Sequence, residues 1–341
     1  MKPAACILGC AGPVLTPTEA AFFARVQPWG FILFGRNVEA PEQVRNLVSA
    51  LRAAVGRVGA PVLIDQEGGR VQRLGPPHWR RYPPGRAYGA LKGNDPLFKR
   101  EIVRLGARLL AHDLAALGIN VNCMPVVDVP DVACADVIGD RAFGDMPDEV
   151  AVLGRAACEG LIAGGVLPVI KHIPGQGRAQ ADTHLAMSVV DAAWDDLIER
   201  DFSPFRSLSD MPMAMTAHVV YSAVDRQRPA TISRRVFQTV IREAIGFNGL
   251  VMSDDISMKA LTGGLAQRAR QARWAGCDVV LHCNGDLAEM DLVATGAGTL
   301  TGQTLKRADA ALARVARSPE PFDASAARAR YDEAFEGRWA A

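Results

Sequence analysis

The chain has 341 residues, of which 49% are hydrophobic and 22% are charged, and its formal net charge is +1. This profile is that of an ordinary globular protein. A near-neutral balance without a basic run argues against nucleic acid or an anionic membrane as partner. No apolar stretch approaches the roughly 18 residues that a membrane-spanning helix needs.

The N-terminal residues and the cysteines bear on the compartment. Residues 7–10 loosely resemble a lipoprotein cleavage box, but only Lys2 precedes them. Their apolar run is also shorter than the roughly 7–15 residues of a signal core, so a first core strand is the better interpretation. The seven cysteines, at positions 6, 10, 123, 134, 158, 277 and 283, form no CxxC pair. Reduced, buried thiols in a cytoplasmic protein fit this pattern best.

Short apolar runs alternate with longer amphipathic segments along the whole chain. The apolar runs predict buried strands at 6–10, 31–35, 61–65, 119–127, 166–171, 213–219, 249–253 and 278–282. Helical periodicity is present, for example, at 41–55, 99–117, 148–163, 193–208, 234–244, 264–275, 287–300 and 304–316. Eight such alternations are the signature of a (β/α)8 TIM barrel.

The main alternative in the α/β class is a doubly wound sheet, but no GxGxxG follows the first strand. Residues 75–92, rich in Pro, Arg and Gly, predict a long loop, and residues 318–341 predict a peripheral helix. No change of composition marks a linker. We therefore predict one TIM-barrel domain over 1–341, with a core of about 5–317 and C-terminal helices outside it.

Residues 171–184 concentrate polar groups directly after an apolar run. Lys171 and His172 end the predicted strand, and Asp182 and His184 follow a loop that contains Pro and Gly. The carboxyl end of a parallel strand is where α/β folds place their chemistry. A carboxylate that accepts one ring N–H would orient the His184 imidazole and raise its basicity. A histidine on a surface loop also fits the position.

Charged residues follow other predicted strands as well. Asp65 and Arg73 follow the third strand, Arg141 the fourth, and Asp254 and Asp255 the seventh. In a barrel these ends converge on one mouth. Asp254 could be a nucleophile, a base or a metal ligand. The structural alternative is that one of the two aspartates, more naturally Asp255, caps a helix over 256–261.

Simpler structural roles also fit several of these residues. Asp65 could pair with Arg70 or Arg73, and His172 could be a satisfied core histidine. Lys171 could be a Schiff-base amine or a donor to substrate hydroxyls.

Cofactor motifs are missing from the sequence. It has no phosphate-binding loop, dinucleotide fingerprint or HExxH. The spacing of possible metal ligands is poor, although His172, His218 and Asp254 could converge; His218 and His282 carry little signal by themselves. We therefore expect no cofactor and no metal.

Taken together, the motifs resemble the bacterial β-N-acetylhexosaminidases of glycoside hydrolase family 3. The resemblance runs from the first strand to about Asn284. It rests on residues 64–73 (IDQEGGRVQR), 139–144 (GDRAFG), 171–177 (KHIPGQG), 182–184 (DTH) and 253–258 (SDDISM). Each segment alone is moderately specific, but their order and barrel-like spacing make the match specific.

The resemblance implies retaining hydrolysis through a covalent glycosyl-enzyme intermediate. It makes Asp254 the nucleophile and His184 the proton donor and acceptor, with Asp182 orienting His184. It assigns the terminal N-acetylglucosamine to Asp65, Arg73, Arg141, Lys171 and His172. The implied substrates are muropeptides of the GlcNAc-anhydroMurNAc type, cleaved in the cytoplasm during peptidoglycan recycling. We expect a monomer.

An imidazole acid is unusual, because most retaining glycosidases use two carboxylates about 5–5.5 Å apart. The ordinary pKa of histidine, about 6.5, lies near neutral working pH, where acid/base catalysis is effective. The chain also departs from the usual family loop, KHFPGHG, at Ile173 and Gln176. We expect retained activity with altered loop dynamics.

Other functions remain open from the sequence. One is a family 3 β-glucosidase, although those enzymes usually take their acid/base from a second domain, which Asp182 and His184 make unnecessary. Another is a phosphorylase that uses phosphate in place of water. From different classes come a Schiff-base aldolase using Lys171 and a metal-dependent barrel hydrolase. A non-catalytic sugar-binding protein would be expected to lack Asp254 or His184, and both are present.

Overall fold

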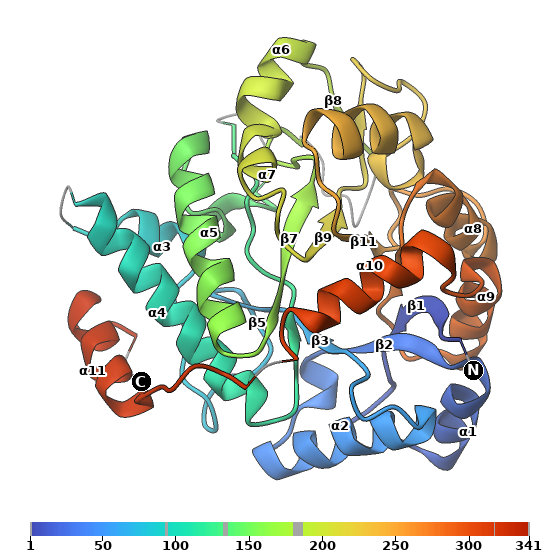
Figure 1. The fold of residues 1–341 in the computed structure, drawn as a ribbon, viewed down its shortest axis with the longest axis horizontal. Helices are drawn as coiled ribbons and strands as arrows, with labels where there is room; N and C mark the ends of the chain where they lie inside the picture. Colours follow the sequence, from blue (N-terminus) through green and yellow to red (C-terminus); the bar gives the residue numbers. More distant parts are fainter. Residues whose placement is uncertain (1, 93–94, 132–135, 180–186, 317, 340–341) are drawn as a thin grey trace.

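The computed structural model describes residues 2–92, 95–131, 136–179, 187–316 and 318–339. Eight parallel strands close into a barrel in the spatial order β1-β12-β11-β9-β7-β6-β3-β2, and helices surround it (Figure 1). The predicted (β/α)8 fold is therefore confirmed. The barrel strands are β1 (Ala4–Leu8), β2 (Pro28–Leu33), β3 (Val62–Ile64), β6 (Val121–Asn122), β7 (Leu167–Ile173), β9 (Met213–Thr216), β11 (Leu250–Asp255) and β12 (Val279–His282).

Every predicted strand overlaps one barrel strand. This agreement is expected, because a strand that is covered on both faces has a continuous apolar sequence. Two small sheets were not predicted. One joins β4 (Gln66–Gly68) to β5 (Val71–Gln72), and the other joins β8 (Ser188–Val190) to β10 (Val219–Tyr221). Both consist of strands too short to show a period in the sequence. Both follow the carboxyl ends of barrel strands, where the mouth of the barrel is built.

The helices that cover the barrel are mostly those predicted. The principal ones are α1 (Pro17–Val26), α2 (Pro41–Val55), α4 (Pro96–Ala115), α5 (Pro147–Ala163), α8 (Leu265–Ala275), α9 (Leu287–Ala297) and α10 (Gly302–Ala313). Helix α1 was not predicted, although Thr16 and Glu19 form a capping box at its start. The long loop predicted at 75–92 contains one short helix, α3 (Gly85–Gly89).

Two helix predictions need correction. The segment 193–208 is divided into α6 (Trp194–Asp196), a π-helical turn (Leu197–Asp201) and α7 (Ser203–Ser207). The interruption lies at Phe202, just before Pro204 in the first turn of α7, because Pro204 has no N–H to continue the helical hydrogen bonds. The helix predicted at 256–261 is a series of turns. A further π-helix spans Val236–Ala244.

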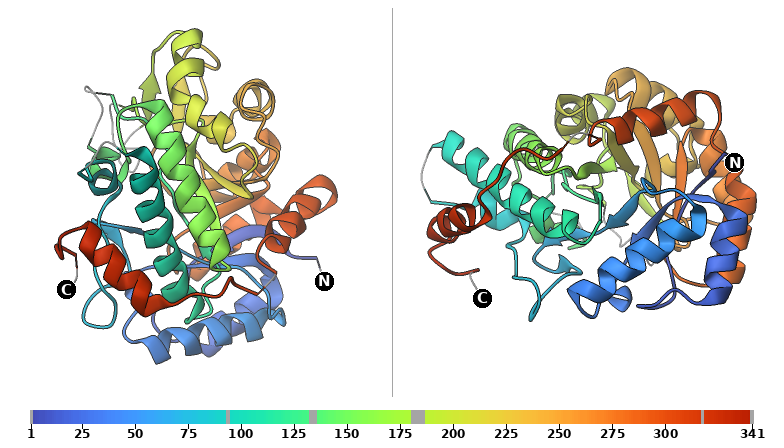
Figure 2. Two further views of the ribbon diagram at one scale, coloured as in Figure 1. Left: turned by 60° about the vertical axis from the view of Figure 1, so that its left-hand side comes forward. Right: turned by 60° about the horizontal axis from the view of Figure 1, so that its bottom comes forward.

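The C-terminal helix α11 (Ala324–Ala334) packs on α4, as the predicted peripheral helix should (Figures 1 and 2). The Tyr331 hydroxyl lies 2.5 Å from that of Tyr88 in the 75–92 segment. Arg328 forms an ion pair with Asp113 of α4 at 2.6 Å. The helix therefore fastens the long segment after β5 to the outside of the barrel, on the side of the molecule opposite the N-terminus (Figure 2).

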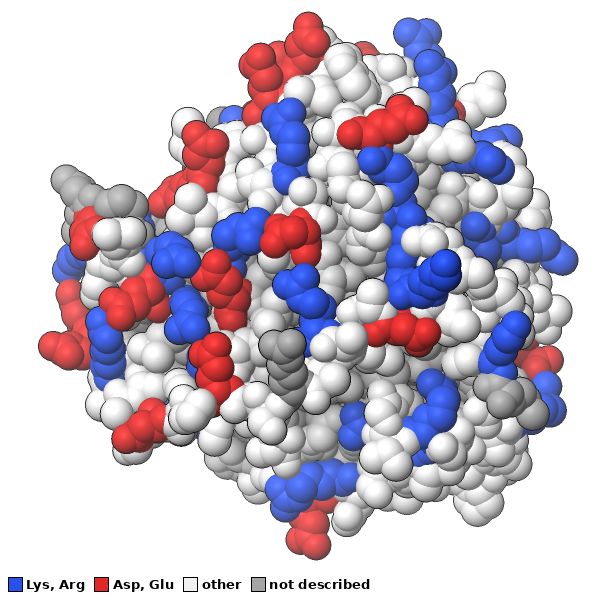
Figure 3. Space-filling view, viewed as in Figure 1, with Lys and Arg blue, Asp and Glu red and all other residues white. Residues whose placement is uncertain are grey.

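The described cysteines and surface charges are distributed as in an ordinary globular protein. Five of the six described cysteines are buried and all six are free. Burial raises the pKa of the Cys6 and Cys10 thiols to about 12. No helix in the described part of the chain is long and apolar enough to cross a membrane. Positive and negative side chains are interspersed over much of the face in Figure 3.

A buried carboxylate holds the amino-terminal end of the barrel together. Asp278, which precedes β12, is fully buried and accepts a hydrogen bond from Val251 N at 2.9 Å. Arg242 and Arg307 each lie 3.2 Å from its oxygens.

We expect Asp278→Ala to lower the free energy of unfolding by about 2–4 kcal/mol, because two half-buried guanidinium groups lose their counter-charge. Urea denaturation would measure this. The exposed Asp309→Ala on α10 should change it by less than about 0.5 kcal/mol, and equal effects would contradict the assignment.

Candidate active site

The carboxyl ends of the barrel strands surround a cavity of about 200 Å³. Its lining includes six residues that the sequence singled out: Asp65, Arg73, Arg141, Lys171, His172 and Asp254. They follow or end four barrel strands, β3, β6, β7 and β11, and Arg73 lies in the β4–β5 hairpin region that follows β3. Asp182 and His184 lie outside the described residues. The barrel therefore brings together the predicted polar residues that the structure describes.

A buried network of alternating charges forms one wall of the cavity. Lys171 Nζ lies 2.9 Å from Asp65 Oδ1 and 2.6 Å from Glu67 Oε1. Arg141 binds the Glu67 carboxylate with two nitrogens, at 2.8 and 2.9 Å. Arg73 completes the series at 3.4 Å from Asp65 Oδ2. Of the two partners considered for Asp65, Arg73 is therefore the one observed, because Arg70 instead pairs with Asp140 at 2.9 Å.

The pKa shifts show that the network is held in its charged form. Burial by itself would raise the pKa of Glu67, but the Arg141 and Lys171 charges lower it well below the ordinary range. Burial would also raise the pKa of Asp65, but the charges of Lys171 and Arg73 lower it instead. Burial would lower the pKa of Lys171, and Asp65 and Glu67 raise it instead. A Schiff-base amine needs a lowered pKa, so this environment disfavours the aldolase alternative.

His172 is fixed on the cavity wall by a buried aspartate. Its Nδ1 lies 2.7 Å from Asp128 Oδ2, and its backbone N–H donates to Asp128 Oδ1 at 3.1 Å. The backbone N–H of Gln176 donates to the same Oδ1 at 2.6 Å. His172 is therefore a satisfied histidine, as one interpretation held, and it also lines the cavity. With Nδ1 engaged, any contact from the ring to a ligand would be made by Nε2.

Asp254 stands near the end of β11, where the strand passes from the buried barrel into the mouth. The backbone N–H of Asp255 donates to Asp254 Oδ1 at 2.8 Å. The Asp255 carboxylate accepts from Ser257 N at 3.0 Å and from Ser257 Oγ at 2.7 Å. Asp255 thus acts as a cap, as the structural alternative proposed, but it caps a turn. Asp254 is left facing the cavity.

His218 supports the same strand end from behind. Its Nε2 donates to the carbonyl oxygen of Asp255 at 2.9 Å, and its Nδ1 bonds Thr231 Oγ1 at 2.7 Å. Burial lowers the pKa of His218, which favours the neutral ring. Because both ring nitrogens are engaged, this histidine does not converge with His172 and Asp254 on a metal. Within the described ranges, no group of three His, Cys, Asp or Glu could hold a metal ion.

The base of the segment that leads toward position 184 is tightly anchored. A side chain at Gly177 would meet the Val129 carbonyl oxygen at 1.9 Å, so only glycine fits there. Tyr221 Oη donates to the Gly175 carbonyl at 2.5 Å, and Arg178 pairs with Asp201 at 2.8 Å. These two glycines serve close packing.

Two residues that build the site, Glu67 and Asp128, were given no role from the sequence, and His218 was considered only as a possible metal ligand. Glu67 lies inside the 64–73 motif, but nothing in the sequence pairs it with Arg141, 74 positions away. Asp128 follows the fourth predicted strand, and its position could have suggested a polar strand end. His218 had a similar signal, because it follows the sixth strand directly.

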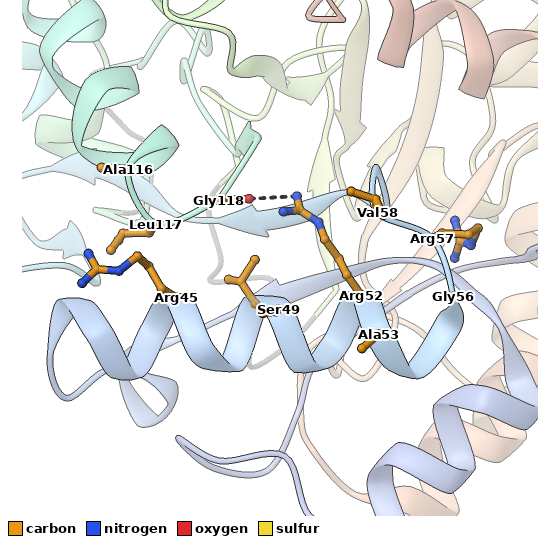
Figure 4. Close-up of a pocket in the computed structure, with 11 residues that line it drawn as sticks. Arg45, Ser49, Arg52, Ala53, Gly56, Arg57, Val58, Ala116, Leu117 and Gly118 are labelled. Carbon is orange, nitrogen blue, oxygen red and sulfur yellow. Dashed lines mark hydrogen bonds between the residues drawn. The ribbon is translucent and has the colours of Figure 1, made fainter.

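A larger hollow, of about 570 Å³, lies at the opposite end of the barrel beside α2. Arg45, Ser49 and Arg52 project from α2 toward the segment before β6, and Arg52 donates to the Gly118 carbonyl (Figure 4). Arg57 likewise donates to backbone carbonyls, including that of Trp29 at 3.2 Å. These arginines close the turns at the amino ends of the strands. Catalytic groups of TIM barrels lie at the other face, so the smaller cavity is the candidate site.

The fold and the cavity define an enzyme of the (β/α)8 class with a mouth built to bind a polar ligand. A family model described as glycosyl hydrolase family 3 N terminal domain matches residues 18–318. The chain belongs to this family of glycoside hydrolases.

Similar proteins agree with this assignment. A protein named Beta-hexosaminidase from Nitrosomonas eutropha is 39% identical over 284 residues, which cover 82% of this chain and 80% of that protein. One from Aromatoleum aromaticum is 36% identical over 323 residues, covering 93% and 89%. The crystal structure of NagZ from Neisseria gonorrhoeae with N-trifluoroacetyl-D-glucosamine is 30% identical, with a TM-score of 0.81 and 98% of each chain covered.

We predict that Glu67→Gln will lower the free energy of unfolding at pH 7 by about 3 kcal/mol, because it leaves two buried cations without their shared carboxylate. The pKa of Glu67 is lower in the folded protein than the value of about 4.3 in unfolded chains. The carboxylate therefore contributes stability above that value and loses it as the pH falls. The difference between wild type and variant should shrink below about pH 4.3.

Urea denaturation between pH 3 and pH 7 would measure this difference. The matched control is Glu42→Gln on the exposed side of α2, which should differ little from wild type at any pH. A difference for Glu67→Gln that stayed constant down to pH 3 would show that the carboxylate's charge is not what stabilises the site.

Proposed function

We propose that this chain is a retaining β-N-acetylhexosaminidase that removes terminal N-acetylglucosamine from muropeptides. The observation that carries the proposal is the cavity at the carboxyl ends of the strands. There, the Asp254 carboxylate shares one lining with the charged wall of Asp65, Arg73, Arg141 and Lys171. Charged donors and acceptors of this kind form strong hydrogen bonds with sugar hydroxyl and amide groups. The names of the relatives support the choice of sugar.

The proposed reaction has two steps. In the first, an Asp254 oxygen attacks the anomeric carbon, the glycosidic C–O bond breaks, and His184 gives a proton to the departing oxygen. In the second, water attacks the anomeric carbon, His184 takes its proton, and the Asp254 carboxylate is released. Asp182 orients the His184 ring. The Asp255 N–H, bonded to Asp254 Oδ1, leaves Oδ2 as the attacking oxygen.

Sugar binding falls to the residues that the network fixes in place. Lys171 and Arg141 offer donors, Asp65 accepts from hydroxyls, and His172 contributes through Nε2. Because each side chain is already held by an ion pair or by Asp128, little conformational entropy is lost on binding. We also propose that the chain is a single domain that acts as a monomer in the cytoplasm, in peptidoglycan recycling.

Trapping of the intermediate tests the nucleophile. A 2-acetamido or 5-fluoro glycosyl inactivator should label Asp254, as mapped by peptide mass spectrometry. Asp254→Ala should prevent labelling and lower turnover of an aryl N-acetyl-β-glucosaminide about 10⁴-fold or more. Asp309→Ala on α10 should leave both unchanged. A label on any other residue would overturn the mechanism. Adding phosphate should not change the rate or yield a sugar phosphate.

The acid role of His184 is tested by the leaving group. With His184→Ala, kcat/KM for an alkyl glycoside should fall about 10²–10⁴-fold, because its leaving oxygen needs a proton. For a dinitrophenyl glycoside the loss should be much smaller, since that group departs unprotonated. The matched control is His112→Ala on α4, which should affect neither substrate. Equal losses for the two substrates, or none, would contradict the role.

A further inference from the structure

His282 ends β12 and is fully buried, yet the site described above gives it no role. Its neighbours Leu281 and Cys283 both line the cavity. Successive side chains of a strand point to opposite sides, so His282 points away from the cavity, toward the layer of helices. It therefore lies behind the wall that carries Asp254.

The ring of His282 lies between two carboxylates. Its Nδ1 is 3.7 Å from Asp255 Oδ1, and its Nε2 is 3.4 Å from Glu289 Oε2 on α9. Neither nitrogen has a hydrogen-bond partner among the described residues. The ring is completely removed from water, and its polar contacts are with these two carboxylates at ion-pair distance. His218, by contrast, bonds a hydroxyl and a carbonyl at short distances.

The chemistry of this arrangement is specific. An ionised carboxylate can only accept hydrogen bonds, and a neutral imidazole has one nitrogen that also only accepts. The His282 ring therefore has an acceptor-only carboxylate within ion-pair distance of each nitrogen. Asn284 adds to the arrangement, because its Nδ2 donates to the same Glu289 Oε2 at 2.5 Å. The residues Asp255, His282 and Glu289 form a polar bridge from β11 across β12 to α9.

This bridge reaches Asp254 through Asp255. The Asp255 backbone N–H holds Asp254 Oδ1 at 2.8 Å, and its carbonyl and carboxylate are held by His218 and Ser257. Those contacts come from residues that follow β9 and β11. His282 supplies the contact that ties the Asp255 side chain to the outer helix α9.

We propose that His282 is a positioning residue for Asp254. By bridging Asp255 and Glu289, it fixes the strand end whose N–H orients the attacking carboxylate. The inference rests on the proposed function, because it concerns the rate at which Asp254 attacks the sugar. Sugar binding depends on the opposite wall of the cavity and should be nearly independent of His282.

The test compares catalysis with binding in three variants of the full chain. His282→Leu should lower kcat/KM for an aryl N-acetyl-β-glucosaminide, and the rate of labelling by the glycosyl inactivator, by about 10–100-fold. The Kd for N-acetylglucosamine should stay within about threefold of wild type. Glu289→Gln, at a partly exposed position, should lower kcat/KM by a smaller factor in the same direction. His112→Leu on α4 is the matched control and should change none of these values.

A double-mutant cycle separates positioning from general damage. If His282 acts through Asp255, then adding His282→Leu to Asp255→Asn should lower kcat/KM by less than about threefold further. Full additivity would overturn the proposal, as would wild-type kcat/KM in His282→Leu. If His282→Leu does not fold, Glu289→Gln decides, and an unchanged kcat/KM in that variant overturns the proposal. A wild-type protein that hydrolysed no N-acetyl-β-glucosaminide would overturn the proposed function as well.

Discussion

The site depends on the Glu67 carboxylate, which lies between Lys171 and Arg141 and supports these two residues of the cavity wall. Two cations cannot be buried side by side without a counter-charge, because desolvation and mutual repulsion act together. Glu67 removes that repulsion and occupies donors of both cations. The remaining donors are thereby held in fixed directions. Arg141 in turn fastens the segment after β6 to the hairpin after β3, so the network also shapes the mouth.

The two sides of the cavity have different physical roles. The charged wall of Asp65, Arg73, Arg141 and Lys171, with Glu67 behind it, is a set of ion pairs that is already charged before any ligand arrives. The opposite side, at the ends of β11 and β12, holds Asp254 through backbone and side-chain contacts of Asp255. Under the proposed function, the charged wall holds the sugar and Asp254 acts on its anomeric carbon from the other side.

Much of the fold followed from the sequence. The eight barrel strands appear as apolar runs because each is covered on both sides, and helix α2 has the bounds that its periodicity predicted. The predictions were wrong where a local pattern is overridden. The segment 193–208 is broken at Phe202, before Pro204, although its hydrophobic period continues, and Ser257 and Met258 bind back to Asp255 in turns. The two small sheets at the mouth are stabilised by their surroundings and leave no periodic trace in the chain.

For the site, the sequence by itself determined which residue types stand at the strand ends, because barrel topology brings those ends to one mouth. It therefore predicted that Asp65, Arg141, Lys171, His172 and Asp254 would meet. Only the tertiary structure decided their partners: Glu67 for Lys171 and Arg141, Asp128 for His172, and Asp255 and Glu289 for His282. Partners such as these are joined across different strands and helices. Their contacts depend on distances of a few tenths of an ångström, which residue order does not specify.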